Sequence, residues 1–497
     1  MRQGKVLLFA AKLLITSSML LLPGAVVHAA TVTVGPSDCS AATVNAAISA
    51  STTHDGDTVV LTCSGTINWA STGTTSWSSS AGYAVSIPAT KGITLMVQGA
   101  SNSNKSTPTF PLTVNVASNV SAIIANIGAS NSPTRISGFK FTNSGTADGF
   151  ITLVGAGTGK DGTGGFRVDD NYFNGVSAYN GVISIWSGRN GTNGNLFGLI
   201  DNNTLFNIYN AGDTSYGPYV IQIWNFWHPG SGNQCWGCDG WSNNDFVYGS
   251  VNQNFIEDNL FDQEASASGH IRHYISSELG ARYVSRHNTF VNNYSDANAD
   301  LHDAHGLCAV DSNGVGSRGG EIYANTITGT GYDRATQLRG GSWLVYDNVI
   351  TSGAGNSIEL NEYRAQASSA SQCNTTSALV LMPPWPVPAS ASWGANDPWR
   401  SDVSNDTSNP GQYHPLPQQI FNSYMWNNKT PAGAAINPVV PADGALTHYV
   451  IANSDYFASS SKPSALSAYT PYTYPHPLRA TAGTAPKPPT GVKANVH

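Results

Sequence analysis

The sequence is poor in charged residues and in lysine. Only 11% of its 497 residues are charged, against roughly a quarter in an average soluble domain. No lysine occurs between Lys160 and Lys429, and 23 Lys and Arg residues face 30 Asp and Glu residues, for a formal net charge of −7. This balance argues against a protein that binds nucleic acid through clustered basic residues. Glycine (51) and asparagine (45) are abundant instead, which argues against helical bundles and coiled coils.

Long apolar runs are also lacking, except at the N-terminus. Residues 7–22 are mostly apolar, follow the basic Lys5 and precede the small pair Ala29-Ala30, as in a secretion signal. The run is short and interrupted by polar residues, which disfavours a permanent membrane anchor. We therefore expect residues 1–30 to be a signal peptide. The mature protein is expected to be secreted or periplasmic, monomeric, and without membrane attachment.

Cysteine is scarce, with six residues in the chain. Export makes disulfides their expected state. Sequence order suggests the pairs Cys39–Cys63, Cys235–Cys238 and Cys308–Cys373, which is one of the ~15 connectivities that six cysteines allow. The spacing of Cys235 and Cys238 also occurs in redox and zinc motifs. However, no βαβ pattern surrounds this pair and no second such pair completes a zinc site, so a structural clip is favoured.

A short phrase recurs through the middle of the chain. It consists of an aliphatic residue, two variable residues, Asn, one further residue and an apolar residue, with a degenerate first copy at 136–141. Its asparagines are Asn171, Asn203, Asn259, Asn288, Asn325 and Asn348. Intervals of 32, 56, 29, 37 and 23 residues, taken between successive asparagines, suit a solenoid whose coils carry loops of different length. The 56-residue interval is expected to contain one extra coil.

The phrase has a physical interpretation. Its apolar residues are expected to point into a core, while Asn tolerates the left-handed backbone of a tight bend and can hydrogen-bond to the Asn one coil away. Apolar spacings of three and four, which a helix requires, are absent. The pattern resembles the right-handed parallel β-helix of the pectate-lyase-like superfamily over roughly residues 31–365. This resemblance implies an all-β solenoid and a polysaccharide as its substrate.

Composition divides the chain further. A short helix over 41–50 and a first strand over 57–62 are expected to cap the solenoid, because an open end would expose core and strand edges. The predicted segments are the N-terminal cap and first coils (31–135), the central coils with the active-site face (136–365), an irregular Pro-rich C-terminal segment packed on the solenoid (366–484), and a disordered tail (485–497).

A second strand in each coil is predicted from short alternating runs upstream of each phrase. With the aliphatic residues inward, the outward residues of successive coils form one column, since coils stack ~4.8 Å apart. The predicted column contains Thr152, Ser184, Gln222, Arg272, Arg339 and Glu359. Intervals of 33 residues (272 to 305) and 34 residues (305 to 339) place His305 between the two arginines.

Titratable residues concentrate between 270 and 339, which we interpret as a catalytic face. The candidate catalytic residues are Arg272, His302, Asp303, His305, Arg318 and Arg339, with His270 and Tyr274 behind them. The candidate substrate-binding residues are Gln222, Trp224, Gln337 and Glu359.

These residue types suit β-elimination at a uronic acid. The reaction needs the sugar carboxylate neutralised, a base for the C5 proton and an acid for the leaving oxygen. Arginine forks match carboxylates, and imidazole is a base near neutral pH. We therefore predict that Arg272 and Arg339 neutralise the carboxylate, that His305 or His302 removes the proton, and that Tyr274 donates one.

Other activities remain open at this point. Several β-helix lyase families use a lysine base, which the cluster lacks. Asp303-Ala-His305 is similar to the Asp-Pro-His motif of β-helix mannuronan epimerases, with Ala in place of Pro. A glycoside hydrolase would need two carboxylates, although the aspartates and Gly-His-Gly of β-helix polygalacturonases are absent. The candidate carboxylates are Asp303, Asp311, Glu321, Asp333 and Glu359.

A carbohydrate-binding or adhesive β-helix is the non-enzymatic alternative. Tryptophans near the Cys235–Cys238 pair could stack on sugar rings. They are Trp224, Trp227, Trp236 and Trp241. Such stacking does not separate the classes, because enzymes bind sugars in the same way.

Calcium is the one cofactor that the resemblance suggests, since several β-helix lyases use it. Acidic residues occupy equivalent places in successive phrases and are candidate ligands. They are Asp169, Asp170, Asp201, Glu257 and Asp258. This row lies on a different strand from the arginine column, which favours a structural role.

Overall fold

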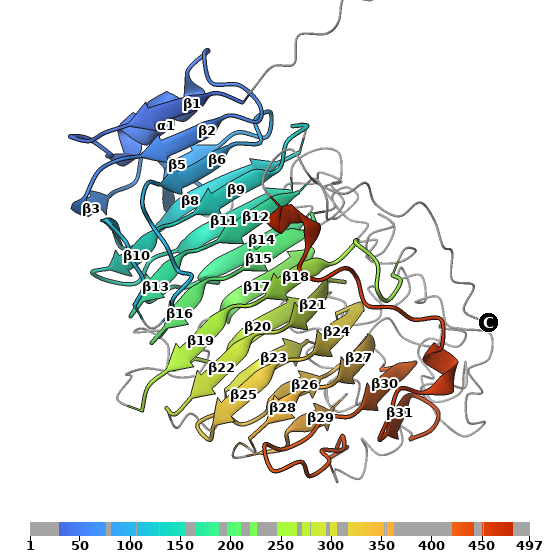
Figure 1. Ribbon diagram of the computed structural model, residues 1–497. Helices are drawn as coiled ribbons and strands as arrows, with labels where there is room; N and C mark the ends of the chain where they lie inside the picture. Colours follow the sequence, from blue (N-terminus) through green and yellow to red (C-terminus); the bar gives the residue numbers. More distant parts are fainter. Residues whose placement is uncertain are drawn as a thin grey trace, which may run out of the picture.

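The computed structural model describes residues 29–75, 81–105, 107–128, 130–155, 165–187, 196–209, 219–225, 246–265, 271–278, 280–294, 299–305, 317–351, 353, 355–361, 420–441, 450 and 452–480. Three long sheets run side by side along the molecule, and each coil from β6 to β29 contributes one strand to each sheet (Figure 1). Strands of successive coils pair in parallel, so that Val168, Ile200 and Ile256 are neighbours across β12, β15 and β18. The predicted right-handed parallel β-helix is confirmed.

The strands of the three sheets have the following bounds. Sheet 1 contains β1 (Thr31–Val34), β2 (Thr58–Leu61), β6 (Thr94–Val97), β9 (Thr134–Ser137), β12 (Phe166–Asp169), β15 (Gly198–Asp201), β18 (Asn254–Glu257), β21 (Arg282–Arg286), β24 (Gly319–Tyr323), β27 (Ser342–Tyr346), β30 (Ser423–Trp426) and β31 (Tyr456–Ser459). Sheet 2 contains β3 (Gly65–Trp69), β7 (Leu112–Val116), β10 (Lys140–Asn143), β13 (Tyr172–Asn174), β16 (Thr204–Phe206), β19 (Leu260–Gln263), β22 (Thr289–Asn292), β25 (Thr326–Gly329) and β28 (Val349–Ile350). Sheet 3 contains β4 (Gly73–Thr74), β5 (Gly82–Ile87), β8 (Val120–Ile127), β11 (Gly149–Gly155), β14 (Ile183–Ser187), β17 (Tyr219–Asn225), β20 (His273–Glu278), β23 (Asp300–Ala304), β26 (Thr336–Leu338) and β29 (Ile358–Leu360).

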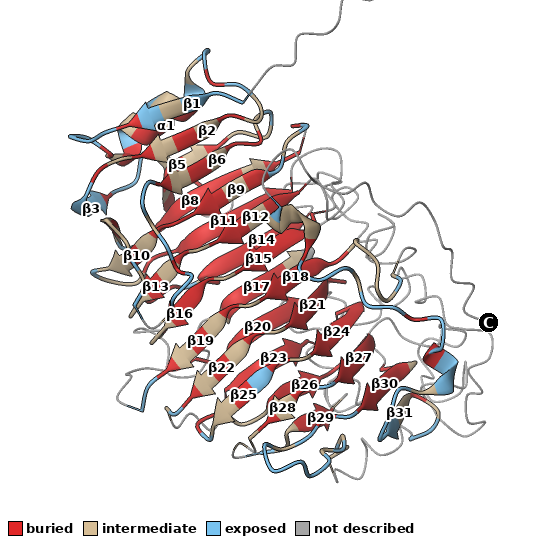
Figure 2. Cartoon of the chain, in the orientation of Figure 1, coloured by how far each residue is buried: buried red, intermediate tan, exposed pale blue. Residues whose placement is uncertain are grey.

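The core lies between the three sheets, whose strands are mostly buried (Figure 2). Like residues stack on like from coil to coil. Phe141 lies over Phe173, with ring centroids 5.3 Å apart, and Phe261 lies over Phe290 at 4.5 Å. Offset aromatic stacks of this kind add to the free energy gained by burying the rings.

A buried ladder of asparagine side chains joins sheet 1 to sheet 2. Each Nδ2 donates to the Oδ1 of the next asparagine at 2.9–3.1 Å, through Asn171, Asn203, Asn259, Asn288, Asn325, Asn348 and Asn428. The predicted hydrogen bonding between coils is therefore confirmed. The predicted extra coil is wrong, because Asn203 and Asn259 bond directly to each other and β15 pairs directly with β18. The 56 residues between them lengthen one coil and do not add another.

The left-handed bend falls one position before each ladder asparagine, not on it. The residues that precede the ladder asparagines have φ between 50° and 57°, and they are Asp170, Asn202, Asp258, His287, Ala324, Asp347 and Asn427. The ladder side chain instead stabilises this bend from the next position, since its Nδ2 also donates to a backbone carbonyl of the preceding coil, as Asn288 does to Ile256. The requirement that recurs from coil to coil is thus an amide side chain at one position and a tight turn at the position before it.

A helix closes the N-terminal end of the solenoid. Helix α1 (Ala41–Ser49) begins after Ser40, whose side chain accepts a hydrogen bond from Thr43 N, and it buries Val44 and Ile48 against the first coil. The predicted disulfide Cys39–Cys63 is present. The Cys235–Cys238 and Cys308–Cys373 pairs, like residues 1–28 of the expected signal peptide, lie outside the described residues.

The solenoid continues beyond residue 365, where the central coils were expected to end. Strand β30 pairs with β27, and Asn428 extends the asparagine ladder. Residues 464–480, here called the C-terminal strap, then run back along sheet 1 from β31 towards β12 (Figure 1). The strap contains the 3-10 helices η5 (Ser464–Leu466) and η6 (Pro477–Arg479). Within the described residues, no helix combines the length and apolar character needed to span a bilayer.

The acidic row of sheet 1 is neutralised by arginines. Asp169 binds Arg135, Asp201 binds Arg167 at 2.8 and 2.9 Å, and Glu257 binds Arg286 at 2.6–2.7 Å. Asp170 contacts Arg135 at 4.0 Å, and Asp258 binds Arg479 of the strap. Each of these carboxylates thus lies within 4.0 Å of an arginine, which disfavours calcium in this row.

His476 of the strap makes the attachment sensitive to acid. Its backbone N–H donates to Glu257, and its ring is buried against Phe255. Burial, aided by Arg286 and Arg167, lowers the pKa of His476 to about 3. Between pH 6.5 and about 3, the unfolded chain therefore binds a proton that the folded chain does not, so stability falls as the pH falls through this range.

We expect His476→Asn to reduce this acid sensitivity, because the Asn Oδ1 can replace the His476 Nδ1 that accepts from Leu478 N. The measurement is the thermal midpoint of both proteins from pH 7 to pH 4. The wild-type midpoint should fall more steeply, because its stability decreases by up to about 1.4 kcal/mol per pH unit in this range. Parallel curves would contradict the assignment.

Candidate active site

Two rows of outward side chains cross the coils of sheet 3. The first row contains Tyr219, His273, Asp300 and Arg334. The second row contains Gln222, Ser276, Asp303, Gln337 and Glu359. In the second row, Thr152, Ser184, Gln222 and Glu359 lie where the sequence predicted, but Ser276 and Gln337 occupy the places predicted for Arg272 and Arg339. Strand β20 aligns Ser276, and not Arg272, with Gln222 of β17, and its residues Tyr274 and Ile275 face the core as Val220 and Ile221 do.

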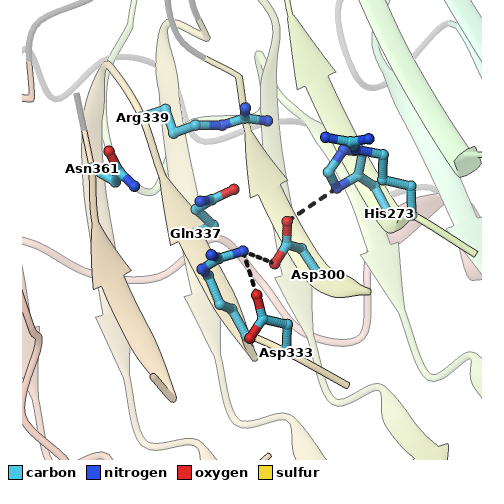
Figure 3. A pocket seen from close by; sticks show the side chains of 8 residues that line it. His273, Asp300, Asp333, Gln337, Arg339 and Asn361 are labelled. Atoms are coloured by element: carbon cyan, nitrogen blue, oxygen red, sulfur yellow. Dashed lines mark hydrogen bonds and ion pairs between the residues drawn. The ribbon is translucent and has the colours of Figure 1, made fainter. Parts of the chain in front are cut away.

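A pocket of about 210 Å³ opens on this face across β20, β23, β26 and β29 (Figure 3). Its lining consists of Arg272, His273, Asp300, Asp333, Arg334, Gln337, Arg339 and Asn361. Arg272 lies just before β20 and Arg339 lies just after β26, and both reach the same pocket. Arg334 Nη1 lies 3.0 Å from Asp300 and 2.7 Å from Asp333, and its Nε lies 3.0 Å from Glu359.

Behind the pocket, Asp303 joins an arginine to two imidazoles. Arg339 Nη2 donates to both carboxylate oxygens at 2.6 Å. The Oδ2 atom lies 3.0 Å from His305 Nδ1 and 3.6 Å from His273 Nε2. His305 Nδ1 also lies 2.5 Å from Glu278 Oε1 and 3.1 Å from Ser276 Oγ. His305 thus contacts the carboxylates behind the pocket and is not part of its lining.

Burial and neighbouring charges keep Asp303 ionised and His273 neutral. Burial opposes ionisation of Asp303, but Arg339, His273 and His305 together hold its pKa well below the usual range. Burial lowers the pKa of His273, an effect that Asp303 and Asp300 only partly offset, so its imidazole is neutral near pH 7. His273 is 2% exposed, and within the described residues neither of its ring nitrogens makes a hydrogen bond.

Tyr219 covers the two imidazoles. Its ring stacks on His273 with centroids 5.5 Å apart and meets His305 edge-on at 6.1 Å. Burial raises the pKa of Tyr219, and the nearby charges of Glu278 and Asp303 raise it further, so the phenol keeps its proton. Trp224 adjoins Tyr219 at 6.2 Å, while Gln222 is buried and accepts from Trp186 Nε1. Of the two, only Trp224 keeps partial exposure.

Three predicted catalytic residues lie elsewhere. His302 faces the core, with its Nδ1 2.9 Å from Ala335 O and its Nε2 2.8 Å from Ser285 Oγ, and burial lowers its pKa to about 4. Tyr274 packs between Phe261 and Phe290 in the core. These placements remove His302 as the base and Tyr274 as the acid.

Arg318 is the third displaced residue. Its guanidinium stacks near Phe246 and Phe421, 4.9 and 5.6 Å from the ring centroids, and burial lowers its pKa to about 10. It does not line the pocket. His270, Asp311, Trp227, Trp236 and Trp241 lie outside the described residues.

The carboxylates proposed for hydrolysis divide between two faces. Glu321 lies on sheet 1, where it accepts from Tyr469 of the strap at 2.5 Å. Asp333 lines the pocket, and Asp303 and Glu359 flank it with arginine partners. Asp300, which the sequence did not single out, is the second lining carboxylate.

Sequence reasoning missed His273, Tyr219, Asp300, Glu278 and Asn361. The available signal was the equal interval of 27 residues that separates His273 from Asp300 and Glu278 from His305. It marks a shorter coil than the ~33-residue period on which the arginine column was built. In this shorter coil, His273 and not His305 lines the pocket.

Comparison with known proteins finds similar structures but no similar sequence. No family model and no curated protein matches the sequence. Similar solved structures include an alginate lyase from Paenibacillus sp. str. FPU-7, with 15% identity, a TM-score of 0.30, and coverage of 66% of this chain and 97% of that one. A mutant of the PL6 family alginate lyase AlyGC has 12% identity and a TM-score of 0.34, and covers 86% of this chain and 53% of that one. A PL6 family polysaccharide lyase from Pseudopedobacter saltans has 13% identity, a TM-score of 0.29, and coverage of 86% and 91%.

The architecture of this chain is a parallel β-helix of three sheets. Likeness at 12–15% identity does not transfer an activity, so function has to be argued from the pocket.

Proposed function

We propose that this protein is a secreted lyase that cleaves a polysaccharide containing uronic acids by β-elimination. The observation that carries the proposal is the convergence of Arg272, Arg334 and Arg339 with the neutral imidazole of His273 in one pocket. The pocket lies on a long parallel face, which suits an extended sugar chain laid across the coils.

Neutralisation of the sugar carboxylate is assigned to Arg272 and Arg339. Guanidinium groups bind carboxylates through paired N–H donors and keep their charge at any physiological pH. Asp303 fixes Arg339 through two hydrogen bonds of 2.6 Å, so this guanidinium is oriented before substrate arrives. Fixed charge placed where negative charge develops is the most effective form of electrostatic catalysis.

Proton transfer is assigned to His273 and Tyr219. His273 takes the C5 proton; the electrons of the C5–H bond form the C4–C5 double bond, and the C4–O bond breaks. The leaving oxygen then takes the proton of Tyr219, which lies one coil away and stacks on His273. His273 replaces His305 in this role because it lines the pocket, whereas His305 lies behind it against Glu278.

Hydrolysis is the second candidate, supported by the two carboxylates that line the pocket. Asp300 and Asp333 both contact Arg334, and burial raises the pKa of Asp333, as a general acid requires. An epimerase would share the first proton transfer with the lyase and differ in returning the proton to the opposite face.

The deciding experiment incubates the full chain with a panel of uronic-acid and neutral polysaccharides. Ultraviolet absorbance of the new double bond supports the lyase. Reducing ends without that absorbance support the hydrolase, and retained binding without products supports a carbohydrate-binding protein. Altered uronate composition without cleavage supports the epimerase.

Arg272→Gln is expected to lower the rate of elimination about 100-fold, because one charge that neutralises the carboxylate is lost. The comparable change Arg135→Gln removes an arginine that pairs with Asp169 on sheet 1, away from the pocket. Its rate should remain within about twofold of wild type. Initial rates on the substrate found in the panel provide the measurement, and equal losses in both variants would contradict the assignment.

A further inference from the structure

We propose that His273, Asp303 and His305, with Glu278 beside them, form a binding site for a divalent transition-metal ion. One ligand atom from each of the first three residues falls within 4.8 Å of the other two. Tetrahedral metal–ligand bonds of ~2.0–2.2 Å place ligand atoms ~3.3–3.6 Å apart. The separations between Asp303 Oδ2 and the two imidazole nitrogens, 3.0 and 3.6 Å, are close to this value. The three residues are held on adjacent parallel strands, β20 and β23, with His305 one residue past the end of β23.

Crowding of carboxylates at one imidazole nitrogen supports a cation there. His305 Nδ1 has Glu278 Oε1 at 2.5 Å and Asp303 Oδ2 at 3.0 Å. A ring nitrogen carries at most one hydrogen, which can point well at only one of these oxygens. A metal ion bound to Nδ1 would interact with both carboxylates at once.

The second, independent observation is the state of His273. It is 98% buried, yet within the described part of the chain neither ring nitrogen makes a hydrogen bond. Nε2 faces Asp303 Oδ2 at 3.6 Å, a separation suited to a shared ion, and Nδ1 faces Asp300 Oδ2 at 3.4 Å. An imidazole that directs one nitrogen to a carboxylate and the other to a metal is the usual arrangement of ligating histidines.

The charge around the imidazoles also favours a cation. Three carboxylates contact the two rings: Asp300 contacts His273, Glu278 contacts His305, and Asp303 contacts both. Arg339 pairs with Asp303 and Arg334 with Asp300, so the carboxylates still outnumber these two arginines. Two imidazoles and a carboxylate are a donor set for Zn²⁺, Co²⁺ or Ni²⁺, whereas Ca²⁺ and Mg²⁺ prefer oxygen donors alone. The inferred ligand is therefore a borderline first-row ion.

Metal binding and elimination would exclude each other. The ion would occupy the lone pair of His273 Nε2, and the same imidazole takes the C5 proton in the proposed reaction. Bound Zn²⁺ is therefore an inhibitor. This consequence rests on the proposed function, whereas the existence of the site does not.

The test of the site uses the full chain, freed of metal by a chelator and then titrated with Co²⁺ and Zn²⁺. We expect visible absorption bands of tetrahedral Co²⁺ and one equivalent bound, which excess Zn²⁺ displaces. Separate variants His273→Gln and His305→Gln should lose this equivalent or bind it at least ~100-fold more weakly, since loss of even an outer-shell partner costs 10–100-fold. His54→Gln, which alters a histidine 65% exposed in the N-terminal cap, should bind as wild type does.

Thermal melts separate loss of a ligand from loss of the fold. Zn²⁺ should raise the midpoint of wild type and of His54→Gln but not those of the two site variants, whose midpoints without metal show whether they fold. Unchanged Co²⁺ binding in both folded site variants, or no binding by wild type, overturns the site.

The inhibition is measured separately, on the substrate found in the polysaccharide panel. Saturating Zn²⁺ is expected to lower the wild-type rate at least ~10-fold, with recovery on chelation. A rate that metal leaves unchanged or increases overturns the competition at His273, while the Co²⁺ spectra still decide the site. Absence of any lyase activity would refute the proposed function and leave the binding result standing.

Discussion

Replacing His273 with glutamine is expected to lower the rate of elimination by at least ~100-fold, because general bases typically contribute 10²–10⁴-fold. Glutamine keeps a polar side chain of similar reach but has no basic nitrogen. The measurement is kcat and KM on the substrate found in the polysaccharide panel. The loss should fall in kcat, since proton removal occurs after binding.

The same experiment separates His273 from His305, the base that the sequence favoured. His305→Gln removes contacts to Glu278 and Asp303 but leaves the imidazole that lines the pocket. Its loss of kcat should be at least ~10-fold smaller than that of His273→Gln. The reverse order would return the role of the base to His305, and wild-type turnover by both variants would remove this cluster from the reaction.

Replacing Asn288 with alanine is expected to cost about 2–5 kcal/mol in free energy of unfolding. Asn288 Oδ1 accepts from both the backbone N and the Nδ2 of Asn259 at 3.0 Å. Alanine therefore removes the acceptor of the buried Asn259 N–H and one of the three acceptors of Asn259 Nδ2, and Ile256 O loses the Asn288 Nδ2 that donates to it. Each unsatisfied buried group costs ~1–3 kcal/mol. Chemical denaturation monitored by circular dichroism provides the measurement.

The control for this change is Asn115→Ala. Asn115 Nδ2 donates to Asn68 Oδ1 at 2.8 Å across neighbouring coils, but this asparagine pair is exposed to solvent. Water replaces the lost bond, and the cost should stay below about 0.5 kcal/mol. Similar costs at the two positions would show that the buried ladder does not stabilise the solenoid.

The sequence predicts the architecture well because that architecture is repetitive. An amide that must sit beside its equivalent one coil away leaves a visible phrase, and six asparagines found from spacing alone belong to the ladder. Helix α1 and the Cys39–Cys63 disulfide were predictable for local reasons: a capping serine, apolar residues four apart, and two early cysteines in an exported chain.

The pocket is less predictable because it depends on the register of individual strands. The run at 271–274 suggested Arg272 for the column, but β20 pairs with β17 four residues further on, which places Ser276 in the column and His273 in the neighbouring outward row that lines the pocket. His302 illustrates the same limit: Ser285 and Ala335 satisfy its two nitrogens inside the core, and neither partner is near it in sequence. The spacing of residues in the sequence indicates which coil carries a side chain, but it does not indicate whether that side chain points into the core or outward.

The C-terminal strap affects how the solenoid unfolds. Solenoids contact only their nearest coils, so they tend to unravel from an open end. Here, Tyr469 bonds to Glu321 on β24, His476 to Glu257 on β18, and Arg167 on β12 to Leu478. One segment thus ties three well-separated strands together, and peeling the final coils away requires it to detach first. The C-terminal end of the solenoid is therefore held in place by residues 464–480, as helix α1 covers the opposite end.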